Sequence, residues 1–249
     1  MSYNDIGIII LAAGKGTRMK SDKPKVLHKV AGKSMVVHVI ETAKKITSDN
    51  IHVVVGHKAQ DVKVEIDKYF KVNFAIQKKL IGTGDAVKSA FPGINSSVTN
   101  ILVLCGDVPL IQENTIKNLI NEHKQNKADV SVLAVDVEDP TGYGRIVLDD
   151  NNEMICIKEE ADTSASEKKI KKVNTGIYCF DKNNLISAID EIKPDNNQAE
   201  YYLTDVIEIA KRKQKRIIVV TMKDYRQVIG VNTIKELNQV DDLFKKYGK

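Results

Sequence analysis

The chain has 249 residues and a net charge of +5, with 42% apolar and 29% charged side chains. This is an ordinary globular composition, and the length suits one large α/β domain. The longest apolar run, residues 6–13, is too short to span a bilayer, and no basic segment followed by an apolar one begins the chain. Membrane and secreted proteins are therefore not expected.

The first half of the chain alternates between short apolar runs and segments with helical periodicity. Residues 6–12 form a continuous β-branched run, the pattern of a strand buried on both faces. Further strands are predicted at residues 51–55, 72–76, 101–104 and 130–135. Helices are predicted between them at residues 34–46, 59–70, 83–91 and 113–123. This order predicts a mostly parallel central sheet flanked by helices, with ligands beyond the carboxyl ends of the strands.

The second half is less regular. Closely spaced strand patterns at residues 145–148, 153–158 and 173–180 predict a small antiparallel extension of the sheet. Helices are predicted at residues 182–192, 200–213 and 233–247, with strands at 216–221 and near Val228. No internal repeat or low-complexity linker divides the chain.

The cysteines and histidines point away from disulfide and zinc chemistry. Cys105, Cys156 and Cys179 are widely spaced and lie in apolar, strand-like runs. This pattern indicates buried free thiols and predicts a cytoplasmic protein. The five histidines show no spacing typical of a zinc site.

A glycine-rich turn follows the first strand directly, at Gly14-Lys15-Gly16-Thr17-Arg18. Such a turn exposes backbone N–H groups that bind anions, and Arg18 and Lys25 add positive charge. Residues 15–33 contain seven basic side chains and one acid, which strengthens the prediction of a phosphate site. Met19 excludes the dinucleotide fingerprint G-x-G-x-x-G, and Leu27 excludes a Walker A motif ending at Ser34.

Several segments together resemble a known family. Residues 11–19 read Leu-Ala-Ala-Gly-Lys-Gly-Thr-Arg-Met, and Pro-Lys-Val-Leu follows at 24–27. Further matching segments lie at Gln77, 82–84, 106–110, 139–146, Glu159, 174–176, 200–205 and 230–232. Over essentially the whole chain, this set resembles the sugar-1-phosphate nucleotidyltransferases. Within that family it is similar to the uridyltransferase (pyrophosphorylase) domains of bacterial bifunctional N-acetylglucosamine-1-phosphate uridyltransferase/glucosamine-1-phosphate acetyltransferases.

The resemblance implies a Rossmann-like nucleotide-diphospho-sugar transferase fold and a Mg²⁺-dependent enzyme. The implied substrates are UTP and N-acetylglucosamine 1-phosphate, and the products are UDP-N-acetylglucosamine and pyrophosphate. Neither nucleic acid nor a membrane is an expected partner, and the sequence leaves the oligomeric state open. Residues 1–231 are expected to form the nucleotidyltransferase domain and residues 232–249 a C-terminal amphipathic helix. No six-residue repeat is present, so a hexapeptide-repeat acetyltransferase domain is not expected.

The resemblance also implies a role for individual residues, at the positions that match the family pattern. Catalytic roles fall to Arg18, Lys25 and Asp107, and Mg²⁺ ligands are Asp107 and Asn232. The implied nucleotide-binding residues are Leu11, Ala12, Ala13, Gly14, Gly16, Gln77, Gly82 and Thr83. The implied sugar-binding residues are Gly144, Glu159, Asn174, Tyr202 and Thr204.

Each residue also has a structural interpretation that involves no ligand. Asp107 suits a turn after a strand, Asn232 suits a helix N-cap, and the Asn174-Thr175-Gly176 segment suits a β-bulge. Tyr202 and Thr204 suit a helix face, and Glu159 suits an acidic surface.

Other functions also stay open. A related enzyme would use another sugar 1-phosphate or another base, and a nucleotide-sugar sensor would share the fold without catalysis. Nucleic-acid binding depends only on the basic cluster at residues 15–33.

Overall fold

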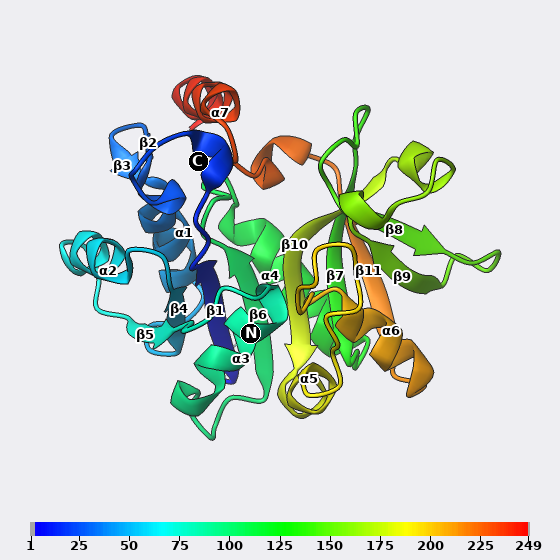
Figure 1. Ribbon diagram of the computed structural model, residues 1–249. Coiled ribbons are helices and arrows are strands. Elements are labelled where there is room, and N and C mark those ends of the chain that lie inside the picture. Colours follow the sequence, from blue (N-terminus) through cyan, green and yellow to red (C-terminus); the bar gives the residue numbers. More distant parts are fainter. Residues whose placement is uncertain (1–2, 249) are drawn as a thin grey trace.

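The computed structural model describes residues 3–248, which are organised around a nine-stranded sheet (Figure 1). The first predicted strand is confirmed as β1 (Ile6–Ala12), which is buried except at Leu11. Its β-branched side chains pack on both faces, as a central parallel strand requires. The strands follow one another across the sheet in the order β11 (Ile217–Met222), β7 (Val130–Asp136), β10 (Lys172–Asp181), β6 (Asn100–Cys105), β1, β4 (Ile51–Val55), β5 (Asn73–Ile76).

The placement of β10 differs from the expected antiparallel extension. β10 lies inside the sheet and runs antiparallel to both β6 and β7, with Tyr178 opposite Val103 on one side and Val132 on the other. The remaining pairs along the sheet are parallel. Ile177 to Phe180 are buried, so this apolar run needs a neighbour on each side.

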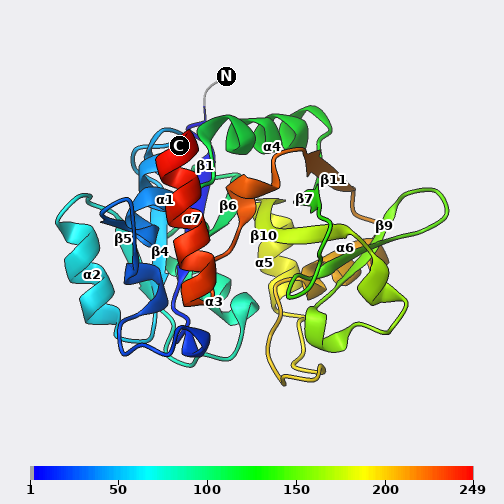
Figure 2. The ribbon, with the colours of Figure 1, turned by 90° about the horizontal axis from the view of Figure 1, so that it is seen from above.

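The helices cover both faces of the sheet, as predicted, and enclose two apolar cores. One core contains side chains of α1 (Met35–Lys44), α2 (Ala59–Asp67) and α4 (Glu113–Gln125). The other contains side chains of α3 (Thr83–Ala90), α5 (Lys182–Ile189) and α6 (Asp205–Arg212). Figure 2 shows α4 and α5 on opposite sides of the sheet. Within residues 3–248, none of the helices combines the length and apolar character that crossing a membrane requires.

An antiparallel hairpin, β8 (Arg145–Leu148) and β9 (Met154–Lys158), joins the sheet where Arg145 lies opposite Val173 of β10. This hairpin confirms the predicted antiparallel extension for residues 145–148 and 153–158, whereas residues 173–180 belong to β10 inside the sheet. The Arg145 guanidinium is almost fully buried and forms an ion pair of 2.7 Å with Glu160. The ion pair ties the start of β8 to the segment that follows β9, and Glu160 also accepts a hydrogen bond from the backbone N–H of Gly142.

The last helix, α7 (Ile234–Tyr247), packs near the end of the sheet beside a hairpin that the sequence did not predict, β2 (Lys29–Val30) and β3 (Lys33–Ser34) (Figure 1). Val240 of α7 is fully buried in a third apolar cluster, which also contains Met19, Val30 and Met35. The helix therefore contacts the segment that follows the glycine-rich turn.

Two predicted elements are wrong in part. The helix predicted to begin at Glu200 begins at Asp205, because the backbone N–H of Tyr201 donates to Ile81 and its carbonyl accepts from Gly84. These tertiary hydrogen bonds hold residues 200–204 in a loop. The strand predicted near Val228 is a short 3₁₀ helix, Tyr225–Val228.

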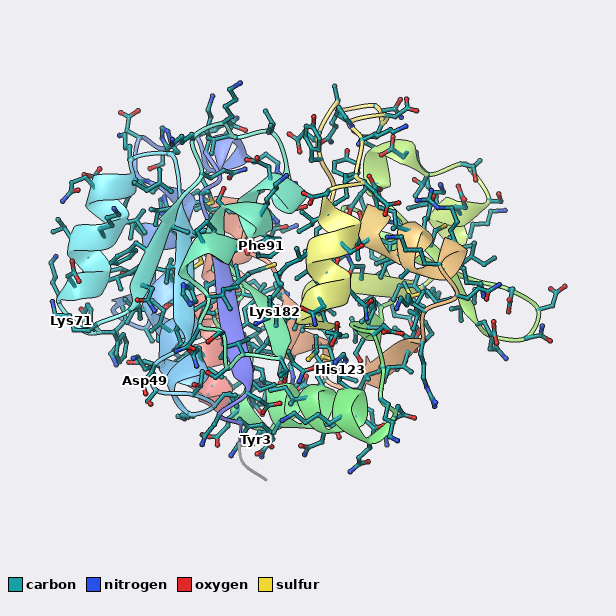
Figure 3. The ribbon with its side chains drawn as sticks, turned by 90° about the horizontal axis from the view of Figure 1, so that it is seen from below. Tyr3, Asp49, Lys71, Phe91, His123 and Lys182 are labelled. Atoms are coloured by element: carbon teal, nitrogen blue, oxygen red, sulfur yellow. The ribbon has the colours of Figure 1, made fainter. Side chains whose placement is uncertain are left out.

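A buried histidine joins α4 to the sheet. His123, labelled in Figure 3, contacts the Asn100 Oδ1 atom through Nε2 at 3.0 Å and the Ser131 Oγ atom through Nδ1 at 2.7 Å. Burial lowers its pKa to about 4. Because the amide oxygen can only accept, Nε2 carries the proton and Nδ1 accepts from Ser131.

Candidate functional site

The glycine-rich turn is open to an anion. The backbone N–H groups of Gly14, Lys15 and Gly16 find no acceptor among the described residues. Gly16 has a φ of 63°, and a Cβ atom there would overlap the side chain of Lys25. Glycine is required at this position for both reasons, and the turn presents unpaired donors beside a lysine.

This turn borders a cavity of about 530 Å³ at the carboxyl ends of β1 and β6. The predicted nucleotide-binding residues all line this cavity, together with two of the predicted catalytic residues: Leu11, Ala12, Ala13, Gly14, Gly16, Gln77, Gly82, Thr83, Lys25 and Asp107. Seven lining residues were not predicted: Lys15, Thr17, Val26, Leu80, Ala86, Cys105 and Glu200. Lys15 and Thr17 lie within the glycine-rich motif and Glu200 lies within the matching segment 200–205, and these signals could have indicated the three residues.

Gln77 presents an acceptor in this cavity. Its side chain is buried, and Nε2 donates to the carbonyl of Gly82 and to Asp85, each at 3.0 Å. A carbonyl cannot donate, so this contact fixes the orientation of the amide. Oε1 is left with no partner among residues 3–248 and can accept a hydrogen bond from a ligand.

The loop of residues 200–204 packs against Gly82 and Thr83, which form another wall of this cavity. Thr83 Oγ1 accepts a hydrogen bond of 2.9 Å from the backbone N–H of Leu203. Gly82 has a φ of 122°, and a Cβ atom there would overlap the backbone of Tyr201. The two segments therefore approach each other closely only because residue 82 is glycine.

Three of the predicted residues meet at the edge of the cavity. The Lys25 ammonium contacts Asp107 Oδ2 and lies 2.8 Å from Asn232 Oδ1, although Lys25 and Asn232 are 207 positions apart. The backbone N–H of Val231 donates to the Asp107 carbonyl at 3.0 Å. The interpretation of Asn232 as the N-cap is wrong, because Thr233 caps α7 and Asn232 precedes the cap.

This arrangement fits a hard divalent cation. Asp107 Oδ2 and Asn232 Oδ1 already converge on one positive group, the Lys25 ammonium. Within the described part of the chain, no group of three or more His, Cys, Asp or Glu side chains is arranged to hold a metal. Mg²⁺ commonly takes one or two oxygen ligands from protein and the rest from phosphates and water. The donor pair therefore suits Mg²⁺ held together with a phosphate ligand.

Arg18 stands apart from this group. It lies on a short 3₁₀ helix, Thr17–Met19, with its side chain exposed and outside the lining of the cavity. It makes no ion pair or hydrogen bond with the described residues. The role predicted for Arg18 remains a prediction.

The predicted sugar-binding residues form a second group beside the first. Thr204 donates to Glu159 Oε1 at 3.1 Å, and a Cβ atom at Gly144 would lie 3.2 Å from Oε2 of the same carboxyl group. The backbone N–H of Asn174 donates to the Gly144 carbonyl at 2.8 Å. These contacts join four of the five predicted residues, while Tyr202 lines an adjacent cavity together with Glu159.

The Asn174-Thr175-Gly176 segment is a β-bulge, as its structural interpretation predicts. The Asn174 side chain accepts from the Gly176 N–H at 3.1 Å and donates to the Tyr178 hydroxyl at 2.6 Å. The Cys105 thiol contacts the Gly176 carbonyl at 3.4 Å, so the bulge also touches the first cavity. The two groups of predicted residues therefore adjoin through Cys105 and through the loop of residues 200–204.

The two cavities differ in charge. The first has lysines at the glycine-rich turn, whereas the second, of about 750 Å³, is lined by seven carboxyl groups and three basic side chains. Burial raises the pKa of Glu159, and burial together with Glu208 and Glu159 raises the pKa of Asp205 to about 6. The electrostatic potential from these side chains therefore favours anions at the glycine-rich turn and disfavours them in the cavity beside Glu159.

Comparisons with known proteins agree with this geometry. Curated relatives include the bifunctional protein GlmU of Clostridioides difficile, 43% identical over 96% of this chain and 51% of the relative. The bifunctional protein GlmU of Bacillus subtilis is 40% identical over 96% of this chain and 52% of the relative. This chain therefore spans about half the length of these relatives.

Solved structures share the fold at lower identity. A UDP-glucose pyrophosphorylase complexed with UDP-glucose superposes with a TM-score of 0.77 at 18% identity, covering 96% of this chain and 98% of the other. HddC from Yersinia pseudotuberculosis, complexed with GMP-PN, gives 0.72 at 21% identity, covering 96% and 99%. The α/β fold predicted from the sequence is confirmed. The model of the nucleotidyl transferase family matches residues 7–233, and the chain belongs to this family.

Proposed function

We propose that this chain transfers UMP from UTP to N-acetylglucosamine 1-phosphate, in a Mg²⁺-dependent reaction that releases pyrophosphate. The observation that carries this proposal is the convergence of Lys25, Asp107 and Asn232 beside a turn with unpaired backbone donors. Identity of about 40% with GlmU proteins over 96% of the chain supports the choice of substrates.

The nucleotide occupies the first cavity in this proposal. The free Oε1 of Gln77 accepts a hydrogen bond from the N–H of the uracil, and the backbone around Ala12 and Ala13 faces the nucleoside. The N–H groups of Gly14 to Gly16 bind phosphate oxygens. A base that presents an acceptor at the same edge would face the Gln77 oxygen without a hydrogen bond.

Transfer requires positioning and charge neutralisation more than proton transfer. An oxygen of the sugar phosphate attacks the α-phosphorus of UTP, the bond between the α-phosphorus and its bridging oxygen breaks, and pyrophosphate leaves. The attacking phosphate is already largely ionised near neutral pH, since its second pKa is about 6. Lys25 holds phosphate oxygens in place and balances their charge. Asp107 and Asn232 would hold Mg²⁺, which supplies further charge neutralisation when bound.

The uncharged end of the sugar points toward Glu159. The seven carboxyl groups around the second cavity repel phosphate, so the hydroxyl and N-acetyl groups are the part that enters. Glu159 and Thr204 offer hydrogen bonds to those groups, and Gly144 leaves room beside the carboxylate. We propose Tyr202 and Asn174 as the flanking residues of this pocket.

The domain assignment and compartment are also proposals. We assign residues 1–231 to the nucleotidyltransferase domain and residues 232–249 to the C-terminal helix with the residues that precede it. A cytoplasmic location is supported by the free state of Cys105, Cys156 and Cys179.

Pyrophosphate release tests the proposal. The purified chain is given UTP and Mg²⁺ with N-acetylglucosamine 1-phosphate or glucose 1-phosphate, and EDTA serves as the control. Release that requires the metal and the N-acetylated sugar supports the proposal. Release with another sugar or another nucleotide would change the substrate, and no release with any pair would favour a nucleotide-sugar sensor.

A further inference from the structure

The first turn of α7 contacts the proposed metal ligand directly. The carboxyl oxygen Oε2 of Glu236 accepts hydrogen bonds from the Thr233 N–H at 2.8 Å and from the Thr233 hydroxyl at 3.0 Å. In return, Thr233 Oγ1 accepts from the Glu236 N–H, which completes a capping box. The same Glu236 oxygen accepts a third hydrogen bond, of 2.7 Å, from the backbone N–H of Asn232. Capping the helix does not require this third bond.

The Asn232 side chain is oriented by its surroundings. Its Nδ2 group lies 3.4 Å from the Gly230 carbonyl, and its Oδ1 atom accepts from Lys25. The preceding residue, Val231, is fixed by its hydrogen bond to the Asp107 carbonyl. With Val231 held on one side and Thr233 on the other, the bond from Glu236 fixes the backbone from which the amide oxygen projects.

The helix that carries Glu236 is itself anchored to the phosphate-binding side of the molecule. Val240 is fully buried against a cluster that includes Met19. Asp241 accepts a hydrogen bond of 2.7 Å from the backbone N–H of Ala31 and pairs with Lys245. Asp241 is therefore a second anchor of α7 that does not touch Asn232.

We propose that Glu236 is a positioning residue for the proposed metal site, which holds the Asn232 amide oxygen toward Asp107. This inference rests on the proposed function, because it concerns the ligand pair assigned there to a divalent cation. Residues that orient metal ligands commonly change metal affinity by about 10–100-fold when they are lost. α7 is then part of the site, and its capping box sets the affinity for the cation.

Mn²⁺ uptake in the presence of UTP, measured by water-proton relaxation, tests this proposal without relying on turnover, because the phosphates of UTP supply the remaining oxygen ligands. Glu236→Ala should raise the half-saturating Mn²⁺ concentration by about tenfold or more. Glu236→Gln should stay within about threefold of the wild type, because Gln also completes a capping box. Asp241→Ala is the matched control, and it should lower the thermal midpoint while leaving the half-saturating Mn²⁺ concentration unchanged.

The outcomes separate positioning from stability. A half-saturating Mn²⁺ concentration for Glu236→Ala within twofold of the wild type would overturn the proposal, as would an equal weakening in Asp241→Ala. If Glu236→Ala does not fold, Glu236→Asp replaces it. Its shorter side chain withdraws the carboxylate from Asn232, and unchanged Mn²⁺ uptake would then overturn the proposal.

The proposed function can fail separately. A wild-type chain that takes up Mn²⁺ but releases no pyrophosphate would remove the reaction and leave the positioning role in place. A wild-type chain that takes up no Mn²⁺ would overturn both the metal site and the role of Glu236.

Discussion

Replacing Asp107 with alanine removes the only carboxylate in the group that Lys25, Asp107 and Asn232 form. The Asp107 side chain is 18% exposed and that of Lys25 is 16% exposed, so both charges are partly shielded from water. After the change, Asn232 Oδ1 is the one oxygen among residues 3–248 that still accepts a hydrogen bond from the Lys25 ammonium. The site keeps its shape and loses one negative charge.

The size of the effect follows from that charge. Two unit charges 4 Å apart interact by about 4 kcal/mol at the effective dielectric constant of about 20 that suits partly buried sites. Removal of one preorganised charge-stabilising group commonly lowers turnover by about 10²–10³-fold, or about 2.7–4 kcal/mol. The two estimates agree, so Asp107→Ala should lower kcat by about 10²–10³-fold.

The assay is pyrophosphate release at saturating Mg²⁺, UTP and N-acetylglucosamine 1-phosphate. Asp136→Ala is a suitable control, because Asp136 is an exposed carboxylate that pairs with Lys172 at 3.1 Å outside the nucleotide cavity. That variant should keep nearly all activity. A kcat for Asp107→Ala within threefold of the wild type would refute the assignment of Asp107 to the metal.

Three further changes probe other parts of the molecule. Glu159→Ala should raise the KM for the sugar phosphate by about tenfold, the effect of losing one hydrogen bond to a charged group, and leave the KM for UTP within twofold; equal effects would contradict its role. Gly82→Ala should weaken UTP binding, because the new Cβ overlaps Tyr201; an unchanged KM would count against this close approach. His123 should make the free energy of unfolding depend on pH. The stability of the fold is greatest above the unfolded pKa of His123, about 6.5, where the imidazole is neutral in both states. As the pH falls through the folded pKa of about 4, the free energy of unfolding decreases by about 3 kcal/mol in all. Denaturant titrations of the wild type and His123→Gln at several pH values measure that change, and parallel curves would exclude it.

Much of the fold could be predicted because local pattern and tertiary structure agree. Residues 6–12 are apolar throughout and form the central strand β1, and the periodic segment after residue 59 forms α2. The position of β10 could not be predicted, because its insertion between β6 and β7 depends on pairing across long sequence separations. The loop of residues 200–204 could not be predicted from the local sequence pattern either. Its pattern is typical of a helix, but the backbone hydrogen bonds of Tyr201 to Ile81 and Gly84 hold it in another conformation.

The candidate site also has a part that the local sequence predicts and a part that depends on contacts between distant residues. The glycine-rich turn could be identified as a phosphate site from its residues alone, because glycines and cations there act locally. The contact of Lys25 with Asn232 joins residues 207 positions apart, and only the family resemblance indicated both. Glu236 was not expected at the site at all, because a capping box is an ordinary helix signal.

Pyrophosphate release from UTP, Mg²⁺ and N-acetylglucosamine 1-phosphate by the purified chain tests the proposed function most simply. We expect release that EDTA abolishes and that falls sharply when glucose 1-phosphate replaces the N-acetylated sugar. Absence of release with the N-acetylated sugar, under conditions in which the folded chain binds UTP, would contradict it.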